Sequence, residues 1–182
     1  MSDQNNRILG HYRLLHRLGQ GGFSEVYLGE HIHLKTFASI KILHSQLAED
    51  GMKHFLAEAR TLASLKHPNI VPVLDFGVEA MTPYLVMHYA PNGTLRQRHP
   101  RGIPVALNIV SSYVQQLASA LQYAHNQKII HRDVKPENML IGDQNQLLLS
   151  DFGIAILSAS ARATPDLNAS WISGGTASYM AP

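Results

Sequence analysis

The chain has 182 residues, a length typical of one domain. Its residues are 45% hydrophobic and 15% charged, which supplies enough apolar material for a core and argues against disorder. We expect no membrane span, secretory signal, disulfide or cysteine nucleophile, because long apolar runs and cysteines are lacking and the start, MSDQNNRILG, is polar. A net charge of +2 is too small to indicate binding of nucleic acid or a membrane surface.

The first half of the chain favours β-structure with one helix. Alternating apolar residues and turn signals predict strands at 11–18, 23–29 and 37–43, with two more inside 67–77 and 83–89. Between them, residues 49–65 carry apolar side chains at helical spacing. These side chains belong to Met52, Phe55, Ala59, Leu62 and Leu65.

The second half is led by a long helix predicted over 104–125. Its apolar residues recur at steps of three and four, which predicts one face packed on a core. They are Leu107, Val110, Val114, Leu117, Leu121 and Ala124. Short apolar runs at 139–141 and 147–149 then frame charged loops, and the polar, Ser- and Thr-rich stretch 158–178 reads as a mobile loop.

A glycine-rich segment, Gly19-Gln20-Gly21-Gly22-Phe23-Ser24-Glu25-Val26, lies between the first two predicted strands. Glycines let the backbone approach a ligand closely and direct its N–H groups at phosphate oxygens. No helix follows the segment, which argues against a dinucleotide fold and a P-loop. A flap over phosphates and a plain hairpin turn both fit this pattern.

Lys41 and Glu58 are charged residues placed among apolar ones. Lys41 lies within the strand FASIKIL, and Glu58 falls inside the apolar face of the 49–65 helix, between Phe55 and Leu62. A carboxylate at such a position must be paired or lose free energy on desolvation. Lys41 is its natural partner, and the pair would hold an ammonium group for nucleotide phosphates. A solvated lysine on the outer face of the strand is the alternative.

The segment His131-Arg132-Asp133-Val134-Lys135-Pro136-Glu137-Asn138, followed by Asp151-Phe152-Gly153, resembles the signature of the protein kinases. The resemblance runs from about Tyr12 to the last residue, and it is strongest to the Ser/Thr branch and to the eukaryotic-like kinases of bacteria. It implies an α+β, protein-kinase-like bilobal fold. The β-rich N-lobe has one helix, and the first part of a helical C-lobe follows.

The resemblance implies a role for each matched residue. Asp133 would orient the substrate hydroxyl and accept its proton, and Lys135 would stabilise the transferring phosphoryl group. Asn138 and Asp151 offer the oxygen ligands that Mg²⁺ prefers. Lys41, paired with Glu58, would contact the α- and β-phosphates of ATP. Phosphoryl transfer needs mainly positioning and charge neutralisation, which this set provides.

The same resemblance places the nucleotide. Val26 and Leu140 would sandwich adenine, Met87 corresponds to the gatekeeper, and the backbone of His88 and Ala90 would bind the adenine edge. The full set of residues expected at ATP is Gly19, Gln20, Gly21, Gly22, Phe23, Ser24, Val26, Ser39, Lys41, Met87, His88, Ala90 and Leu140.

Arg132 resembles the arginine that binds a phosphorylated activation loop in this family. The candidate acceptors in a regulated loop are Ser158, Ser160, Thr164, Ser170 and Ser173, whereas Thr176 resembles the threonine that packs against the catalytic Asp and Lys. A merely solvated loop is the alternative.

Three features depart from the family pattern. Ser24 replaces the third flap glycine, and Ser39 puts a hydroxyl where a methyl normally caps adenine. The chain also stops at Pro182, just before the glutamate that completes Ala-Pro-Glu. We therefore expect a tail at 1–11, an N-lobe at 12–87, a hinge at 88–93 and a partial C-lobe at 94–182, with part of the 104–125 stripe left without its packing surface.

Two functions remain open from the sequence. The first is an ATP-dependent protein Ser/Thr kinase that uses Mg²⁺, acts on protein hydroxyls with autophosphorylation as a further option, and works in the cytoplasm or as the cytoplasmic portion of a membrane-anchored parent. The second is an inactive nucleotide-binding fragment. Among the histidines, His31 and His33 share a strand face without an evident third metal ligand, and His131 is expected to be structural.

Overall fold

The computed structural model describes residues 7–22, 24–44 and 49–152. The chain separates into two compact units, with a boundary between Tyr89 and Ala90. The first unit holds the described residues up to Ser64 together with Pro72–Tyr89, and the second holds Leu65–Val71 together with those from Ala90 onward.

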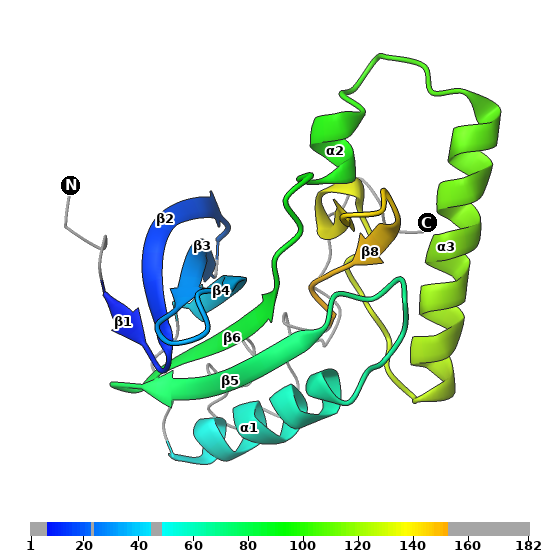
Figure 1. The fold of residues 1–182 in the computed structure, drawn as a ribbon. Coiled ribbons are helices and arrows are strands. Elements are labelled where there is room, and N and C mark those ends of the chain that lie inside the picture. The colour runs from blue at the N-terminus through cyan, green and yellow to red at the C-terminus, as the bar shows by residue number, and fades with distance from the viewer. Residues whose placement is uncertain (1–6, 23, 45–48, 153–182) are drawn as a thin grey trace. The chain divides into compact units, whose positions relative to one another are not determined.

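The first unit contains a six-stranded sheet in the order β1-β2-β3-β4-β6-β5, with every neighbouring pair antiparallel (Figure 1). The strands are β1 (Ile8–Leu9), β2 (Tyr12–Gln20), β3 (Ser24–His31), β4 (Phe37–Leu43), β5 (Val73–Glu79) and β6 (Thr82–His88). Successive strands are mostly joined by tight turns, which accounts for the antiparallel order.

One face of this sheet carries a large apolar core. The core joins Leu9, Tyr12, Leu14, Tyr27, Ala38, Ile40, Ile42, Tyr84 and Val86, all at most 8% exposed. These residues share a face because side chains alternate along each strand, and Tyr27, Ile40 and Val86 are partners across β3, β4 and β6. Gly29 lies opposite Ala38, where the absence of a side chain leaves room for Ile40.

Helix α1 (Glu49–Ala63) packs against β5 and β6 in the first unit (Figure 1). It begins with the acidic residues Glu49 and Asp50 and has the basic residue Arg60 in its last turn. These charges interact favourably with the positive and negative ends of the helix dipole, respectively. Phe55 and Ala59 are its buried residues, at successive turns of one face. The predicted apolar face is therefore confirmed in its centre.

The second unit contains a short helix α2 (Leu95–Arg98), a long helix α3 (Leu107–Asn126), a 3-10 turn η1 (Pro136–Asn138) and the hairpin of β7 (Met139–Ile141) and β8 (Leu147–Leu149). α2 starts in a capping box, because the Thr94 side chain accepts from the Gln97 N–H while the Gln97 side chain accepts from the Thr94 N–H. Asn69 ties this unit together by donating to the side chain of Gln116 on α3 and to the carbonyl of Leu147 on β8.

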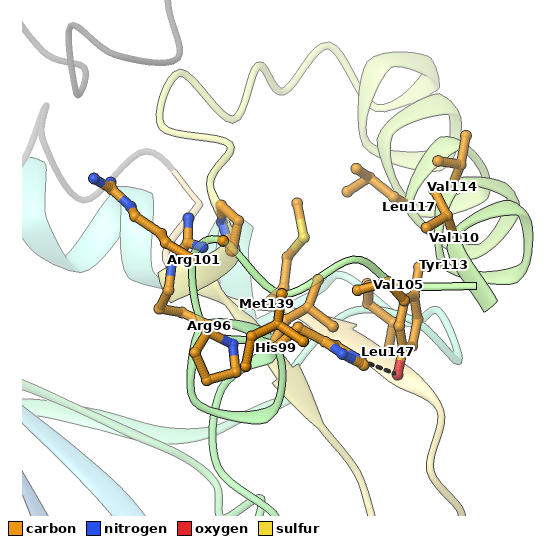
Figure 2. Close-up of a pocket in the computed structure, with 15 residues that line it drawn as sticks. Arg96, His99, Arg101, Val105, Val110, Tyr113, Val114, Leu117, Met139 and Leu147 are labelled. Carbon is orange, nitrogen blue, oxygen red and sulfur yellow. Dashed lines mark hydrogen bonds between the residues drawn. The ribbon is translucent and has the colours of Figure 1, made fainter. Parts of the chain in front are cut away.

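The apolar stripe of α3 is only partly buried, as expected of a stripe that lacks part of its packing surface. Leu107 is 82% exposed and Val114 57%, whereas Ala120 and Ala124 are fully buried. The exposed end borders a hollow of about 510 Å³ within the second unit (Figure 2). Its apolar lining includes Leu95, Ile103, Val110, Val114, Leu117 and Met139, and none of the residues expected at ATP.

Several predicted boundaries were wrong by a few residues. α1 ends at Ala63 rather than Leu65, α3 begins at Leu107 rather than Pro104, and β5 starts only at Val73. Sequence reasoning missed β1 and α2, which are too short for a periodic signal. No helix in the described part of the chain is long and apolar enough to cross a membrane.

Candidate active site

One face of the first unit gathers residues expected at ATP. Val26 on β3 lies opposite Lys41 on β4, and Ser39 on β4 lies opposite Met87 on β6. Residues paired across antiparallel strands, and residues two apart along one strand, share a face. Val26, Lys41, Ser39 and Met87 therefore lie on the face opposite the Tyr27–Ile40 core, and the last three are at most 7% exposed.

The two residues of the expected ion pair belong to the same unit. Lys41 lies in the middle of β4 and is 6% exposed, and Glu58 lies half-buried on α1. A buried ammonium requires a partner or a hydrogen-bonding environment. The burial of Lys41 is therefore not that of a solvated lysine on the outer face. Its pairing with Glu58 stays a prediction.

The glycine-rich segment forms a turn between two strands, as a flap requires. Gly19 and Gln20 end β2, Gly19 lies opposite Val26, and the N–H of Gly21 donates to the carbonyl of Ser24 at 2.8 Å. A side chain at Gly19 or Gly22 would meet nothing within 4 Å, so these glycines are not required by packing within the described protein. Both a flap over phosphates and a plain hairpin turn fit this geometry, so the flap stays a prediction.

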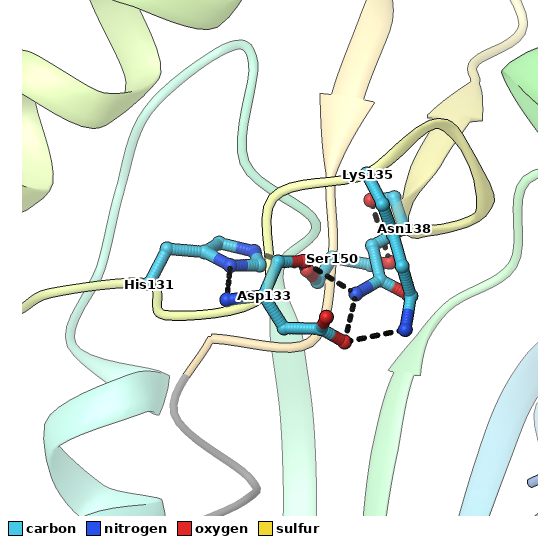
Figure 3. A network of polar contacts seen from close by, with 5 residues as sticks. All are labelled: His131, Asp133, Lys135, Asn138 and Ser150. Carbon is cyan, nitrogen blue, oxygen red and sulfur yellow. Dashed lines mark hydrogen bonds and ion pairs between the residues drawn. The ribbon is translucent and has the colours of Figure 1, made fainter. Parts of the chain in front are cut away.

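The second unit holds the segment from His131 to Asn138 as a compact polar network (Figure 3). His131 is 2% exposed. Its Nδ1 accepts the backbone N–H of Asp133 at 3.2 Å, and its Nε2 lies 2.7 Å from the carbonyl oxygen of Ser150. Because Nδ1 is an acceptor, the neutral ring carries its proton on Nε2 and donates it to Ser150.

The ring of His131 also lies against Phe152, with centroids 4.6 Å apart. Burial lowers the pKa of His131 below its ordinary value, and this effect outweighs the opposing hydrogen bond to Ser150 and the charges of Asp151 and Asp133. His131 is therefore a neutral structural residue that positions the backbone of Asp133, as the sequence predicted.

Asp133 is held by two side chains of the same segment. Asn138 donates from Nδ2 to the Asp133 carbonyl at 2.8 Å and to Oδ2 at 3.0 Å. The ammonium of Lys135 lies 2.6 Å from the same Oδ2, with both side chains of this ion pair about a quarter exposed. The carboxylate is thus fixed in orientation and remains partly accessible, which suits a group that accepts a proton from a substrate.

The β7–β8 hairpin brings Asn138 and Asp151 to one end. Met139 pairs with Leu149, and just beyond this pair the backbone N–H and the hydroxyl of Ser150 both donate to the carbonyl of Asn138, at 2.8 and 2.9 Å. Asn138 commits its nitrogen to Asp133, so its Oδ1 is the atom suited to a hard cation. Asp151 follows at a positive φ of 64° and is half-buried.

Sequence reasoning missed Ser150, which links the two halves of this site through Asn138 and His131. The only available signal was its place directly before Asp151. It also missed the ion pair of Glu137 with Arg96 from α2, at 3.0 Å. Nothing in the spacing of the two residues, 41 apart, indicates that contact.

The remaining predicted residues divide into two groups. Gly22, Ser24 and His88 are in the first unit, and Ala90, Leu140 and an exposed Arg132 are in the second. The other group consists of predicted residues that the structure does not describe. They are Phe23, Gly153, the loop acceptors Ser158, Ser160, Thr164, Ser170 and Ser173, and Thr176.

The histidines near the first strands form a ring cluster. The His11 and His31 rings stack at 5.8 Å, and His33 lies 6.1 Å from His31. Over the residues that the structure describes, no group of three or more His, Cys, Asp or Glu side chains could hold a metal ion. The predicted Mg²⁺ ligands Asn138 and Asp151 are only two residues, and one of them is Asn, so they do not form such a group.

Comparison with known proteins agrees with this arrangement. Residues 12–182 match the protein kinase domain family. The chain is 38% identical over 160 residues to the serine/threonine-protein kinase PrkC of Bacillus subtilis, covering 87% of this chain and 25% of that protein. It is also 38% identical over 179 residues to the serine/threonine-protein kinase Pkn1 of Myxococcus xanthus, covering 95% of this chain and 25% of that protein.

A solved structure gives the same result for the fold. The crystal structure of the kinase domain of Mycobacterium tuberculosis PknI matches with a TM-score of 0.74 at 27% identity, covering 90% of this chain and 70% of that one. The chain spans about a quarter of the length of the two bacterial relatives named above. With a β-rich N-lobe sheet, its helix and the start of a helical C-lobe, the chain belongs to the protein kinase family.

Proposed function

We propose that this chain is the catalytic part of an ATP-dependent protein serine/threonine kinase, with its N-lobe at 12–87, hinge at 88–93 and C-lobe from 94. The single observation that carries the proposal is the network at Asp133. A partly exposed carboxylate held by an amide and an ammonium on one oxygen is arranged as a general base beside a phosphoryl-stabilising cation. We place the activity in the cytoplasm, where ATP is available.

The residues present fit Mg²⁺ and ATP. Asn138 and Asp151 would hold Mg²⁺ through oxygen atoms, since the Asn138 nitrogen is committed to Asp133 and Ser150 keeps the two segments together. The face bearing Val26, Ser39, Lys41 and Met87 would bind ATP. The buried side chains of Ser39 and Met87 suit an adenine ring, and the ammonium of Lys41 suits phosphate.

Bound Mg·ATP supplies the γ-phosphoryl group and the cation that neutralises its charge. The chain's own residues do the rest. Asp133 orients the Ser or Thr hydroxyl of the substrate and takes its proton, Lys135 stabilises charge on the transferring group, and Lys41 positions the phosphates. Asn138 keeps Asp133 in place.

The test uses residues 1–182 with Mg²⁺ and γ-labelled ATP, followed by detection of label on the chain or on a generic basic protein. Label that is abolished by Asp133→Asn supports the proposal. Lys41→Met should remove transfer with a smaller effect on nucleotide binding. Equal loss of both would mean that Lys41 serves the fold rather than the reaction.

The second candidate function, nucleotide binding without turnover, is favoured by the partial exposure of the α3 stripe, which leaves the second unit incompletely packed. A thermal shift with Mg·ATP in the absence of any transferred label would select it. No shift and no label would reject both functions.

A further inference from the structure

Arg96 on α2 holds the carboxylate of Glu137 in the segment that carries Asp133. The Arg96 Nε lies 3.0 Å from Glu137 Oε1, and the two side chains are 27% and 41% exposed. α2 packs on η1 and is fixed at its start by the capping box of Thr94 and Gln97. The pair therefore joins two well-positioned elements of one unit, and it remains accessible to a bound peptide.

The ion pair matches the charge of Glu137 within the protein. Glu137 is a carboxylate that already has a guanidinium as its partner.

The second unit carries an excess of positive charge. Its described Lys and Arg residues are Lys66, Arg96, Arg98, Arg101, Lys128, Arg132 and Lys135, against Asp133, Glu137, Asp143 and Asp151. Of the two carboxylates between His131 and Asn138, Asp133 is paired with Lys135 and Glu137 with Arg96. Arg101 lies on the same side of the α2–α3 hollow as Arg96 (Figure 2).

Glu137 lies four residues after Asp133 in the same segment, so we expect a peptide whose hydroxyl reaches Asp133 to bring its neighbouring residues near the Arg96–Glu137 pair. A cationic neighbour would have to displace Arg96 before it could pair with Glu137, and it would also meet the net positive charge of the described second unit. An anionic neighbour meets complementary charge instead.

We propose that Arg96 is a specificity-determining residue of this kinase: it withholds Glu137 from basic side chains, so that the preferred protein substrate carries Asp or Glu rather than Lys or Arg beside its Ser or Thr. This inference rests on the proposed function, since it concerns the substrate of the same site.

The experiment compares two fluorescently labelled synthetic peptides of equal length with one central Ser, flanked at alternate positions by Glu in one and by Arg in the other. Binding to the 182-residue chain is measured by fluorescence anisotropy at low ionic strength, because exposed charges are screened by salt. No ATP is needed, so peptide preference is measured apart from turnover. Transfer of label from γ-labelled ATP to each peptide is measured separately.

The wild type should bind the Glu peptide more tightly than the Arg peptide. Arg96→Gln should shift the ratio of the two affinities toward the Arg peptide by about two- to fivefold, the range expected of a partly exposed ion pair. Arg96→Lys should keep the wild-type ratio. Arg98→Gln is the matched control: it removes the same charge from the same helix, but Arg98 bonds Asn145 rather than Glu137, so the ratio should change less than twofold.

The double variant with Arg96→Gln and Glu137→Gln should lose the preference gained in Arg96→Gln, because the released carboxylate is then gone. The inference is overturned if the wild type binds the Arg peptide as tightly as the Glu peptide, if Arg96→Gln leaves the ratio unchanged or Arg98→Gln shifts it equally, or if neither peptide binds. Selective binding without transfer refutes the kinase activity alone, whereas equal transfer to both peptides refutes the specificity alone.

Discussion

Replacement of His131 tests whether this buried ring supports the loop that carries Asp133. His131→Phe keeps an aromatic ring against Phe152 but removes the acceptor for the Asp133 N–H and the donor to the Ser150 carbonyl. A buried polar group left unsatisfied costs about 1–3 kcal/mol, and a more exposed one costs less. Ser150 is 7% exposed, so we expect His131→Phe to lower the free energy of unfolding by about 2–4 kcal/mol.

His131→Ala removes the ring as well and adds the cost of a cavity, so its total loss should reach about 4–7 kcal/mol. Urea unfolding followed by far-UV circular dichroism measures both variants against the wild type. A loss below about 0.5 kcal/mol for His131→Phe would show that the two hydrogen bonds do not support the loop.

The same residue gives a pH dependence with a defined sign. Burial lowers the pKa of His131 in the folded state, so below about pH 6.5 the unfolded chain binds a proton that the folded chain does not. Stability from this residue is complete above that pH and falls as the pH drops toward the folded pKa, by at most about 1.4 kcal/mol per pH unit. The difference between unfolding free energies at pH 7.0 and pH 5.5 should be smaller in His131→Phe than in the wild type; an equal difference would contradict the assignment.

Two further substitutions test packing and charge. Gly29→Ala places a Cβ against the side chain of Ile40 in the first-unit core, so it should lower the free energy of unfolding by about 1–3 kcal/mol. Gly19→Ala is the control, because its Cβ meets nothing within 4 Å, and it should lower the free energy of unfolding by less than about 1 kcal/mol. Equal melting temperatures for the two variants would argue against the tight contact at Gly29. Asn138→Asp replaces a donor 3.0 Å from Asp133 Oδ2 with a second carboxylate, so it should destabilise the chain more at pH 8 than at pH 5, where protonation relieves the repulsion. A pH-independent loss in urea unfolding would contradict that reasoning.

Much of the candidate site could be read from the sequence because its residues are close together in the chain. The segment from His131 to Asn138 is a local structure, and its hydrogen bonds from Asn138 to Asp133 span only five residues. The strand FASIKIL was predicted with its observed bounds, since its β-branched and apolar residues have no competing helical period. By contrast, the start of β5 was misplaced, because the apolar residues before Val73 are buried in the second unit rather than in the sheet.

The sequence alone indicated the family, the candidate catalytic residues between His131 and Asn138 and the glycine-rich turn, because each is a local pattern of residue types at fixed spacing. Only the tertiary structure decided that Val26, Lys41, Ser39 and Met87 share one sheet face, since that follows from strand register. It also decided that the α3 stripe is buried only toward its C-terminal end, and that Arg96 neutralises Glu137. Periodicity shows which side of a helix is apolar, but what packs there, and which charges meet, depends on contacts between distant parts of the chain.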